Sequence, residues 1–154
     1  MTERLAAAYP DASIKAIDIA PSVGRLFRGP TDRVTFTQEP AEAAAAREPG
    51  TFDLVLLCDV LHHVPPAARR GLLQSIHRAM APGATFVFKD WLPSFYPIHW
   101  ACSFIDRYVT GDDVRFCTKP AAEAQLREVF GADCIRAEDR VPPWPNNLAL
   151  AIRR

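Results

Sequence analysis

The forty residues from Thr51 to Asp90 constrain the fold more than any other part of the sequence, because their apolar spacing changes period twice. Phe52–Leu57 is a short, almost continuous apolar run, which predicts a strand covered on both faces. Helical spacing follows, and Thr85–Phe88 is a second short apolar run. A strand, a helix and a strand in so few residues predict a βαβ unit, whose right-handed crossover makes the two strands parallel.

The helix in this unit is expected to be amphipathic. Leu72, Leu73, Ile76 and Met80 fall on one side at helical spacing. The opposite side carries Arg69, Arg70, Gln74, Ser75 and Arg78. Proline suits the first turn, where its missing N–H would be unpaired in any case, so Pro65-Pro66 is expected to open the helix and Pro82-Gly83 to prevent its continuation.

Composition excludes several classes of protein. A chain of 154 residues is long enough for one domain with a core, and its formal net charge of zero gives no bulk attraction to nucleic acid. The four cysteines form no CxxC pair, which favours a reduced, cytoplasmic protein without disulfide or zinc frameworks. No basic leader is visible at the N-terminus, and no apolar run approaches the roughly 20 residues of a membrane span.

The remaining spacing continues the alternation of strands and helices. Before the central unit, the expected elements are a helix over Thr2–Tyr9, a strand over Ile14–Ile19, a short helix from Pro21 to Phe27, a strand over Val34–Thr37 and a helix over Pro40–Glu48. After it come an irregular, aromatic-rich insertion over residues 91–118 with a short helix around Trp100–Tyr108, a helix over Lys119–Phe130 capped by Gly131, and strands over Cys134–Val141 and Leu148–Ile152. This order predicts one α/β domain over residues 1–154, with a mostly parallel sheet and helices on both faces.

The central unit also resembles a known family. The segments FDLVLLCDVLHHV and LLQSIHRAMAPGATFVFKD are similar to the fourth strand, the following helix and the fifth strand of class I S-adenosylmethionine-dependent methyltransferases. The resemblance implies a Rossmann-like sheet that ends in an antiparallel strand pair, and S-adenosyl-L-methionine as cofactor. It therefore implies an enzyme, a methyltransferase.

One expected part of that family is missing from the sequence. The family's first strand ends in a glycine-rich turn beside the cofactor, whereas the seven glycines here are scattered and LAAAYPDASIKAIDIAP resembles the segment that follows such a turn. The fold is therefore expected to be N-terminally truncated, with a gap between the strands ending at Asp18 and Leu57. Either these strands close up and pair directly, or a partner chain fills the slot, or the chain is a shortened copy, by a misplaced start or gene decay. If the two strands lay in different sheets, or ran in opposite directions in one sheet, the idea of a missing middle strand would be refuted and the methyltransferase assignment would fall with it.

The resemblance assigns candidate cofactor residues. Asp18, followed by Ile19, matches the acidic residue that holds the ribose hydroxyls, and a carboxylate can accept two hydrogen bonds from a diol. Gln38 and Glu39 follow the third family strand, where relatives often place an acidic residue near adenine. Cys58 and Asp59 follow the fourth family strand, where relatives hold the methionine end of the cofactor and the substrate. Plainer alternatives are a turn aspartate at position 18, a surface loop at 38–39 and a helix cap at Asp59.

Aromatic residues of the insertion are candidates for an acceptor pocket. The substrate-side residues are His63, Trp91, Tyr96, Trp100 and Tyr108, with Phe95 and Phe104 nearby. They can equally form a small core of the insertion, and for His62 and His63 a structural role is favoured over that of a base. No metal site is expected, because the adjacent histidines have no further ligand at metal spacing and Asp112-Asp113 fits a solvated turn.

The sequence thus predicts an S-adenosylmethionine-dependent methyltransferase that acts on a small apolar or aromatic acceptor. The alternative is a non-catalytic remnant or a partner-dependent subunit that does not bind the cofactor alone. A dinucleotide dehydrogenase is a more distant possibility, because it shares only the acidic strand end. The expected partners are a small molecule and either a second copy or another chain in the missing strand's place.

Overall fold

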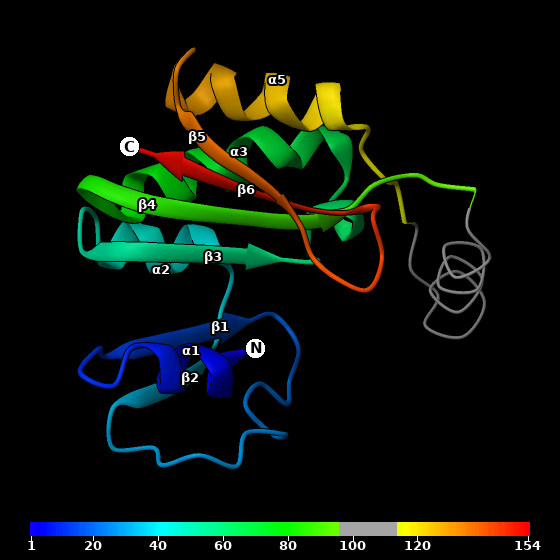
Figure 1. Ribbon diagram of the computed structural model, residues 1–154. Helices are drawn as coiled ribbons and strands as arrows, with labels where there is room; N and C mark the ends of the chain where they lie inside the picture. The colour runs from blue at the N-terminus through cyan, green and yellow to red at the C-terminus, as the bar shows by residue number, and fades with distance from the viewer. Residues whose placement is uncertain (96–113) are drawn as a thin grey trace.

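The computed structural model describes residues 1–95 and 114–154 as strands with helices packed on them (Figure 1). The elements in chain order are α1 (Thr2–Ala8), β1 (Ile14–Asp18), β2 (Val34–Gln38), α2 (Ala41–Arg47), β3 (Phe52–Cys58), the 3-10 turn η1 (Leu61–His63), α3 (Pro66–Ala79), β4 (Met80–Trp91), α5 (Lys119–Phe130), β5 (Ile135–Arg140) and β6 (Asn147–Arg153). These bounds confirm most of the predicted elements, including the cap at Gly131.

The central unit has the predicted geometry. Strands β3 and β4 are parallel neighbours, with Leu56 paired to Val87 and Cys58 to Lys89. Strand β6 pairs antiparallel with both β4 and β5, so the four strands lie in the order β3-β4-β6-β5. The parallel βαβ unit and the C-terminal antiparallel pair are therefore both confirmed.

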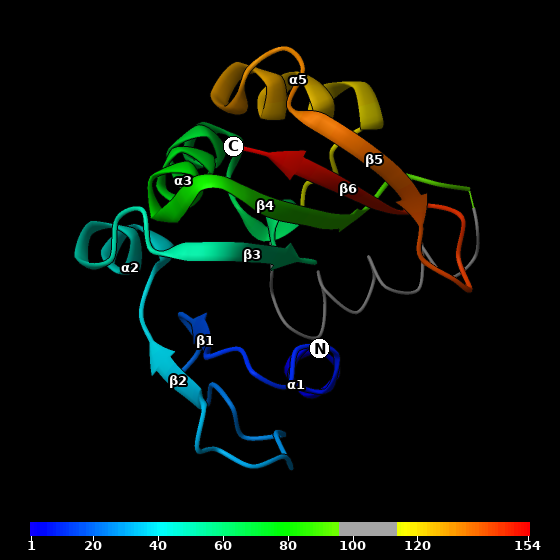
Figure 2. The ribbon, with the colours of Figure 1, turned by 60° about the vertical axis from the view of Figure 1, so that its left-hand side comes forward.

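Strands β1 and β2 form a separate two-stranded parallel sheet. The expectation that Ile14–Asp18 and Phe52–Leu57 share one sheet is therefore wrong, and the two strands have not closed up to pair directly. Figures 1 and 2 show β1 between β2 and β3, with α1 near β1. All five residues of β1 are paired with β2, from Ile14 opposite Val34 to Asp18 opposite Gln38, and Lys15 adds salt bridges to Glu39 and Glu48.

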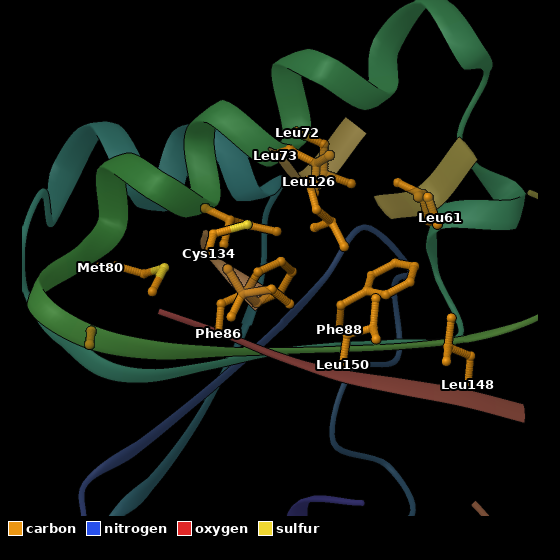
Figure 3. Close-up of a cluster of buried hydrophobic side chains, with 14 residues drawn as sticks. Leu61, Leu72, Leu73, Met80, Phe86, Phe88, Leu126, Cys134, Leu148 and Leu150 are labelled. Carbon is orange, nitrogen blue, oxygen red and sulfur yellow. The ribbon is translucent and has the colours of Figure 1, made fainter. Parts of the chain in front are cut away.

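The hydrophobic core lies between the four-stranded sheet and helices α3 and α5 (Figure 3). Phe86 and Phe88 of β4 and the inward side chains of β6 face Leu73 of α3 and Leu126 of α5, all of them fully or almost fully buried. The sequence predicts an apolar run in β4, and the structure shows that from Ala84 to Asp90 every second side chain of this strand is buried. Figure 1 shows α2 behind β3 and α1 in front of β1, so helices lie on both sides of the strands.

Three details differ from expectation or lie beyond the described residues. Residues 21–27 form turns rather than a helix, because Gly24 adopts a positive φ of 80° and a Cβ there would lie 2.4 Å from the Phe36 ring. Arg69 is buried rather than facing solvent. The helix expected around Trp100–Tyr108 falls outside the described residues, which leave out 96–113.

Candidate functional site

The candidate site residues follow the carboxyl ends of parallel strands. Asp18 ends β1 opposite Gln38 of β2, and Cys58 ends β3 opposite Lys89 of β4. In Figure 1, β1 and β3 both end toward the right of the view. Ligands of open α/β sheets bind in the crevice outside the carboxyl ends of the strands, so this edge is the candidate site.

The structure brings Asp18, Ile19 and Gln38 together. The Asp18 Oδ1 atom accepts a hydrogen bond from the Ala20 N–H at 3.0 Å, which closes a local turn, and the carboxylate is exposed to solvent. Gln38 Nε2 donates to the Ile19 carbonyl at 3.2 Å. Asp18 therefore does form the turn that was its plainer alternative, and that turn orients its carboxylate at the strand end.

Glu39 is committed to an ion-pair network instead. Its buried carboxylate lies 2.5 Å from Arg47 Nη2 and 3.4 Å from Lys15 Nζ, and Lys15 also contacts Glu48. The hydrogen bond from Arg47 is the largest cause that lowers the pKa of Glu39, with a smaller contribution from Lys15. An adenine amino group would have to displace one of these cations, so the geometry favours a structural role for Glu39.

Cys58 and Asp59 lie beside a cation from β4. Asp59 adopts a positive φ of 56°, and its Oδ2 atom lies 2.5 Å from Lys89 Nζ. The other carboxylate oxygen of Asp59 is buried without a hydrogen-bond partner among the described residues. Burial raises the pKa of the Cys58 thiol, and the neighbouring Asp59 adds to the shift, so the thiol stays protonated at neutral pH. Asp59 does not cap α3, whose N-cap residue is Pro65.

The most completely built part of the site is a buried histidine–carboxylate pair. Asp90 Oδ1 contacts His62 Nδ1, and Asp90 Oδ2 accepts a hydrogen bond from the His62 backbone N–H at 3.1 Å. The two residues are only 5% and 4% exposed. A carboxylate can only accept, so Nδ1 donates the hydrogen of this contact and Nε2 is the ring nitrogen that Asp90 does not engage.

The segment beyond the undescribed residues closes over this pair. The Phe116 ring stacks on His62 with a centroid distance of 5.1 Å, and the Arg115 N–H donates to the His62 carbonyl at 2.8 Å. Buried Arg69 donates to the carbonyls of Val64 and Arg115. The imidazole is therefore fixed by its hydrogen bonds, by stacking and by the backbone of a neighbouring segment.

The sequence analysis names His63 as the substrate-side histidine, which stays a prediction, and the structure pairs its neighbour His62 with Asp90. His63 is exposed and lies with its ring 4.2 Å from that of His62, whereas His62 is the residue held by Asp90. A signal was available, because alternation along β4 puts position 90 on the same face as Phe86 and Phe88. A carboxylate on a core face requires a partner, and the LHHV segment offers one.

The other substrate-side candidates are only partly described. Trp91 is half-buried at the end of β4, with Lys89 Nζ 5.8 Å from the centroid of its ring. Tyr96, Trp100 and Tyr108 lie outside the described residues. Within residues 1–95 and 114–154 no group of three or more His, Cys, Asp or Glu is placed to hold a metal ion. The helices in the same ranges are all too short or too polar to cross a membrane.

Comparison with known proteins identifies the family. A family model described as a methyltransferase domain matches residues 1–86, which is more than half of the chain. The chain belongs to the methyltransferase domain family. A curated protein, the ubiquinone biosynthesis O-methyltransferase of Paraburkholderia xenovorans (strain LB400), is 38% identical over 79 residues. That match covers 51% of this methyltransferase domain and 32% of the relative, so the chain matches about a third of the relative's length.

Solved structures agree on the fold. The S-adenosylmethionine-dependent methyltransferase SibL, in its apo form, superposes with a TM-score of 0.75 at 20% identity, over 99% of this chain and 46% of SibL. An S-adenosylmethionine-dependent methyltransferase from Mesorhizobium loti superposes with a TM-score of 0.72 at 18% identity. The superposition covers 99% of this chain and 85% of the Mesorhizobium loti chain. The methyltransferase fold is therefore present although β1 and β3 lie in separate sheets.

Proposed function

We propose that this methyltransferase domain transfers a methyl group from S-adenosyl-L-methionine to a hydroxyl oxygen of a small apolar or aromatic acceptor, with His62 as general base. The observation that carries the proposal is the His62–Asp90 pair at the carboxyl end of β4. The name of the Paraburkholderia relative, an O-methyltransferase, supports the choice of oxygen.

The pair suits proton abstraction from a hydroxyl. A bound sulfonium cofactor supplies an electrophilic methyl group, and the hydroxyl must lose its proton as its oxygen forms the new bond to carbon. Nε2 of His62 receives that proton, and Asp90 at Nδ1 stabilises the resulting imidazolium and holds the ring in orientation. A positioned base of this kind contributes roughly 10²–10⁴-fold to a rate.

The described residues fit one half of the cofactor. Asp18 presents an exposed carboxylate to a vicinal diol, and Gln38 lies beside it, which supports the ribose and adenine end of the binding site. At the methionine end, Cys58 lies next to Asp59, whose buried Oδ1 accepts no hydrogen bond from residues 1–95 or 114–154 and is available to a ligand donor. No strand joins β1 to β3 in the described parts, so the backbone between these two ends is incomplete.

The acceptor is inferred from the surroundings of His62. Phe116 and His63 place aromatic rings against the imidazole, and Trp91 follows Asp90 directly. Rings of this kind pack well against a flat aromatic acceptor. Trp91 and His63, together with the predicted Tyr96, Trp100 and Tyr108, remain our candidates for this contact. Cys58, Cys117 and Cys134 are free thiols, which suits the reducing cytoplasm that we propose as its location.

A second candidate function rests on the separation of β1 from β3. In this account the chain is a remnant or a partner-dependent subunit that does not bind the cofactor alone. Both accounts predict weak or no binding of S-adenosylhomocysteine to residues 1–154, as measured by calorimetry. Submicromolar affinity would show that the backbone between β1 and β3 is not needed.

Methyl transfer separates the two accounts. The assay follows labelled methyl groups from the cofactor to a panel of small phenols, at concentrations of cofactor high enough to offset weak binding. We expect slow transfer that His62→Gln abolishes and that His77→Gln, a histidine of α3 outside the site, leaves unchanged. Absence of transfer to any phenol from the unaltered chain would favour the remnant. Equal loss with both variants would contradict a specific role for His62.

A further inference from the structure

Arg69 is a buried charged residue that the proposed mechanism does not use. It lies near the start of α3 and is only 5% exposed. Its neighbour Arg70 is exposed and forms an ion pair with Glu128 at 3.2 Å on the surface. A charged side chain is seldom buried in a folded protein unless fixed partners satisfy its donors. The partners of Arg69 therefore indicate what its burial achieves.

The guanidinium of Arg69 joins two segments that are far apart in the sequence. Its Nε atom donates to the Val64 carbonyl at 3.0 Å, and its Nη2 atom donates to the Arg115 carbonyl. Val64 ends the turn η1, which carries His62. Helix side chains lean toward the amino end of their helix, which directs Arg69 back toward Val64. One side chain thus bridges the turn of His62 and the segment 115–117.

That segment lies directly against His62. The Arg115 N–H donates to the His62 carbonyl at 2.8 Å, and the Phe116 ring stacks on the imidazole at 5.1 Å with an interplanar angle of 16°. The other end of the segment is held by α5, because Gln125 Nε2 donates to the Cys117 Sγ atom at 3.3 Å. The guanidinium therefore acts on the end of the segment that contacts His62.

The bridge depends on the shape of the arginine side chain. A guanidinium is planar and directs its donors along fixed, diverging lines, so it can serve two carbonyls at once. Hydrogen bonds from a charged donor are also stronger than those between neutral groups. Without this side chain, the carbonyls of Val64 and Arg115 would each lose a charged hydrogen bond, and the segment would be held less firmly on the imidazole.

We infer that Arg69 is a positioning residue, which keeps Phe116 stacked on His62 by bridging the carbonyls of Val64 and Arg115. The ring of His62 is thereby held in the orientation that general-base catalysis requires. This catalytic consequence rests on the proposed function. The effect of Arg69 on the His62 ring does not, and it is measured without cofactor or acceptor.

The test follows the ring protons of His62 by NMR in the whole 154-residue chain. Arg69→Met fills a similar volume but offers no donor. Phe116→Leu gives the position of the His62 signals without the stacked ring, because an aromatic ring shifts the resonances of protons above its face. We expect Arg69→Met to move the His62 signals toward their position in Phe116→Leu. Exchange of the Arg115 amide hydrogen should become at least about tenfold faster.

Two control variants separate this role from general effects on the fold. Arg70→Gln removes a positive charge from the same helix but not from the bridge, and it should leave both the His62 signals and the Arg115 exchange unchanged. Ile152→Ala weakens the core at the end of β6 away from Leu148, the residue that pairs with Asp90, and it should leave the His62 signals in place. Equal movement of the His62 signals in Arg69→Met and in either control would overturn the inference.

Other results would overturn it as well. Unchanged His62 signals in Arg69→Met, when Phe116→Leu moves them, would show that the segment stays in place without the bridge. Unchanged signals in Phe116→Leu would show that the ring does not stack on His62. If Arg69→Met does not fold, Arg69→Lys is judged by the same criterion, because lysine keeps the charge but lacks the planar fork.

A rate measurement then tests the catalytic consequence. Arg69→Lys should lower methyl transfer to the phenol panel by up to about 10²-fold, the effect of misplacing a reacting group by about 1 Å, whereas Arg70→Gln should not. An unchanged rate in a variant whose His62 signals have moved would overturn this consequence. The two failures are distinguishable: absence of transfer from the unaltered chain contradicts the proposed function, whereas unmoved His62 signals contradict the role of Arg69.

Discussion

Replacing Asp90 tests whether the pair with His62 holds this end of the fold together. The carboxylate accepts from the His62 N–H and Nδ1 and from the Trp91 N–H at 2.8 Å, and it is 4% exposed. Asp90→Ala leaves those donors buried without a partner, at about 1–3 kcal/mol for each group that water cannot reach. Three donors lose their acceptor, and we take the lower part of that sum, about 3–5 kcal/mol, as the expected destabilisation.

The measurement is urea unfolding followed by circular dichroism, with thermal melts beside it. A loss of 3 kcal/mol corresponds to a fall in Tm of roughly 6–12 °C for a domain of this size. Asp53→Ala is the matched control, because Asp53 is an exposed strand carboxylate and should change stability by less than about 0.5 kcal/mol. Asp90→Asn keeps the shape and should cost less than Asp90→Ala. A cost below about 1 kcal/mol for Asp90→Ala would refute the reasoning.

Three further predictions concern the rest of the fold. Leu73→Ala should lower the free energy of unfolding in urea by about 2–5 kcal/mol, because the side chain is fully buried. Leu26→Ala, at a position 73% exposed, should leave it unchanged. Equal effects of the two substitutions would contradict the described core. Arg47 lowers the pKa of Glu39, so the stability from this ion pair is present above the unfolded pKa near 4.5 and is lost as pH falls below it. Glu39→Gln should flatten that acid limb of the pH–stability curve, and an unchanged limb would exclude the pair as its cause. Gly24→Ala should destabilise by more than about 1 kcal/mol, since both the positive φ and the adjacent ring oppose a Cβ, and a neutral result would refute that geometry.

The sequence was most informative where the apolar periodicity agrees with prolines and glycines that begin or end an element. The apolar run of β3, the prolines before α3 and the glycine after α5 predicted those elements almost to the residue, because each reports a local backbone requirement. Residues 21–27 misled the reasoning, because a proline followed by a serine favours a helix start, whereas Gly24 adopts a positive φ of 80° that is not helical.

Burial of charge was the part that the sequence did not reveal. Arg69 lies on the polar side of its helix by spacing, yet it is buried because two backbone carbonyls outside the helix accept its hydrogen bonds. The pairing of His62 with Asp90 joins positions 28 residues apart, and the network around Glu39 joins β1, α2 and the end of β2. Such partners are set by tertiary packing, which no local pattern encodes.

The last strand of the chain has a consequence for how the protein is made. Strand β6 is synthesised after all the others, yet it lies between β4 and β5, with Leu148, Leu150 and Ile152 almost fully buried. Until β6 has left the ribosome, Phe86 and Phe88 therefore have no β6 to pack beside. The core between β4, β6 and the helices can close only after this strand has emerged.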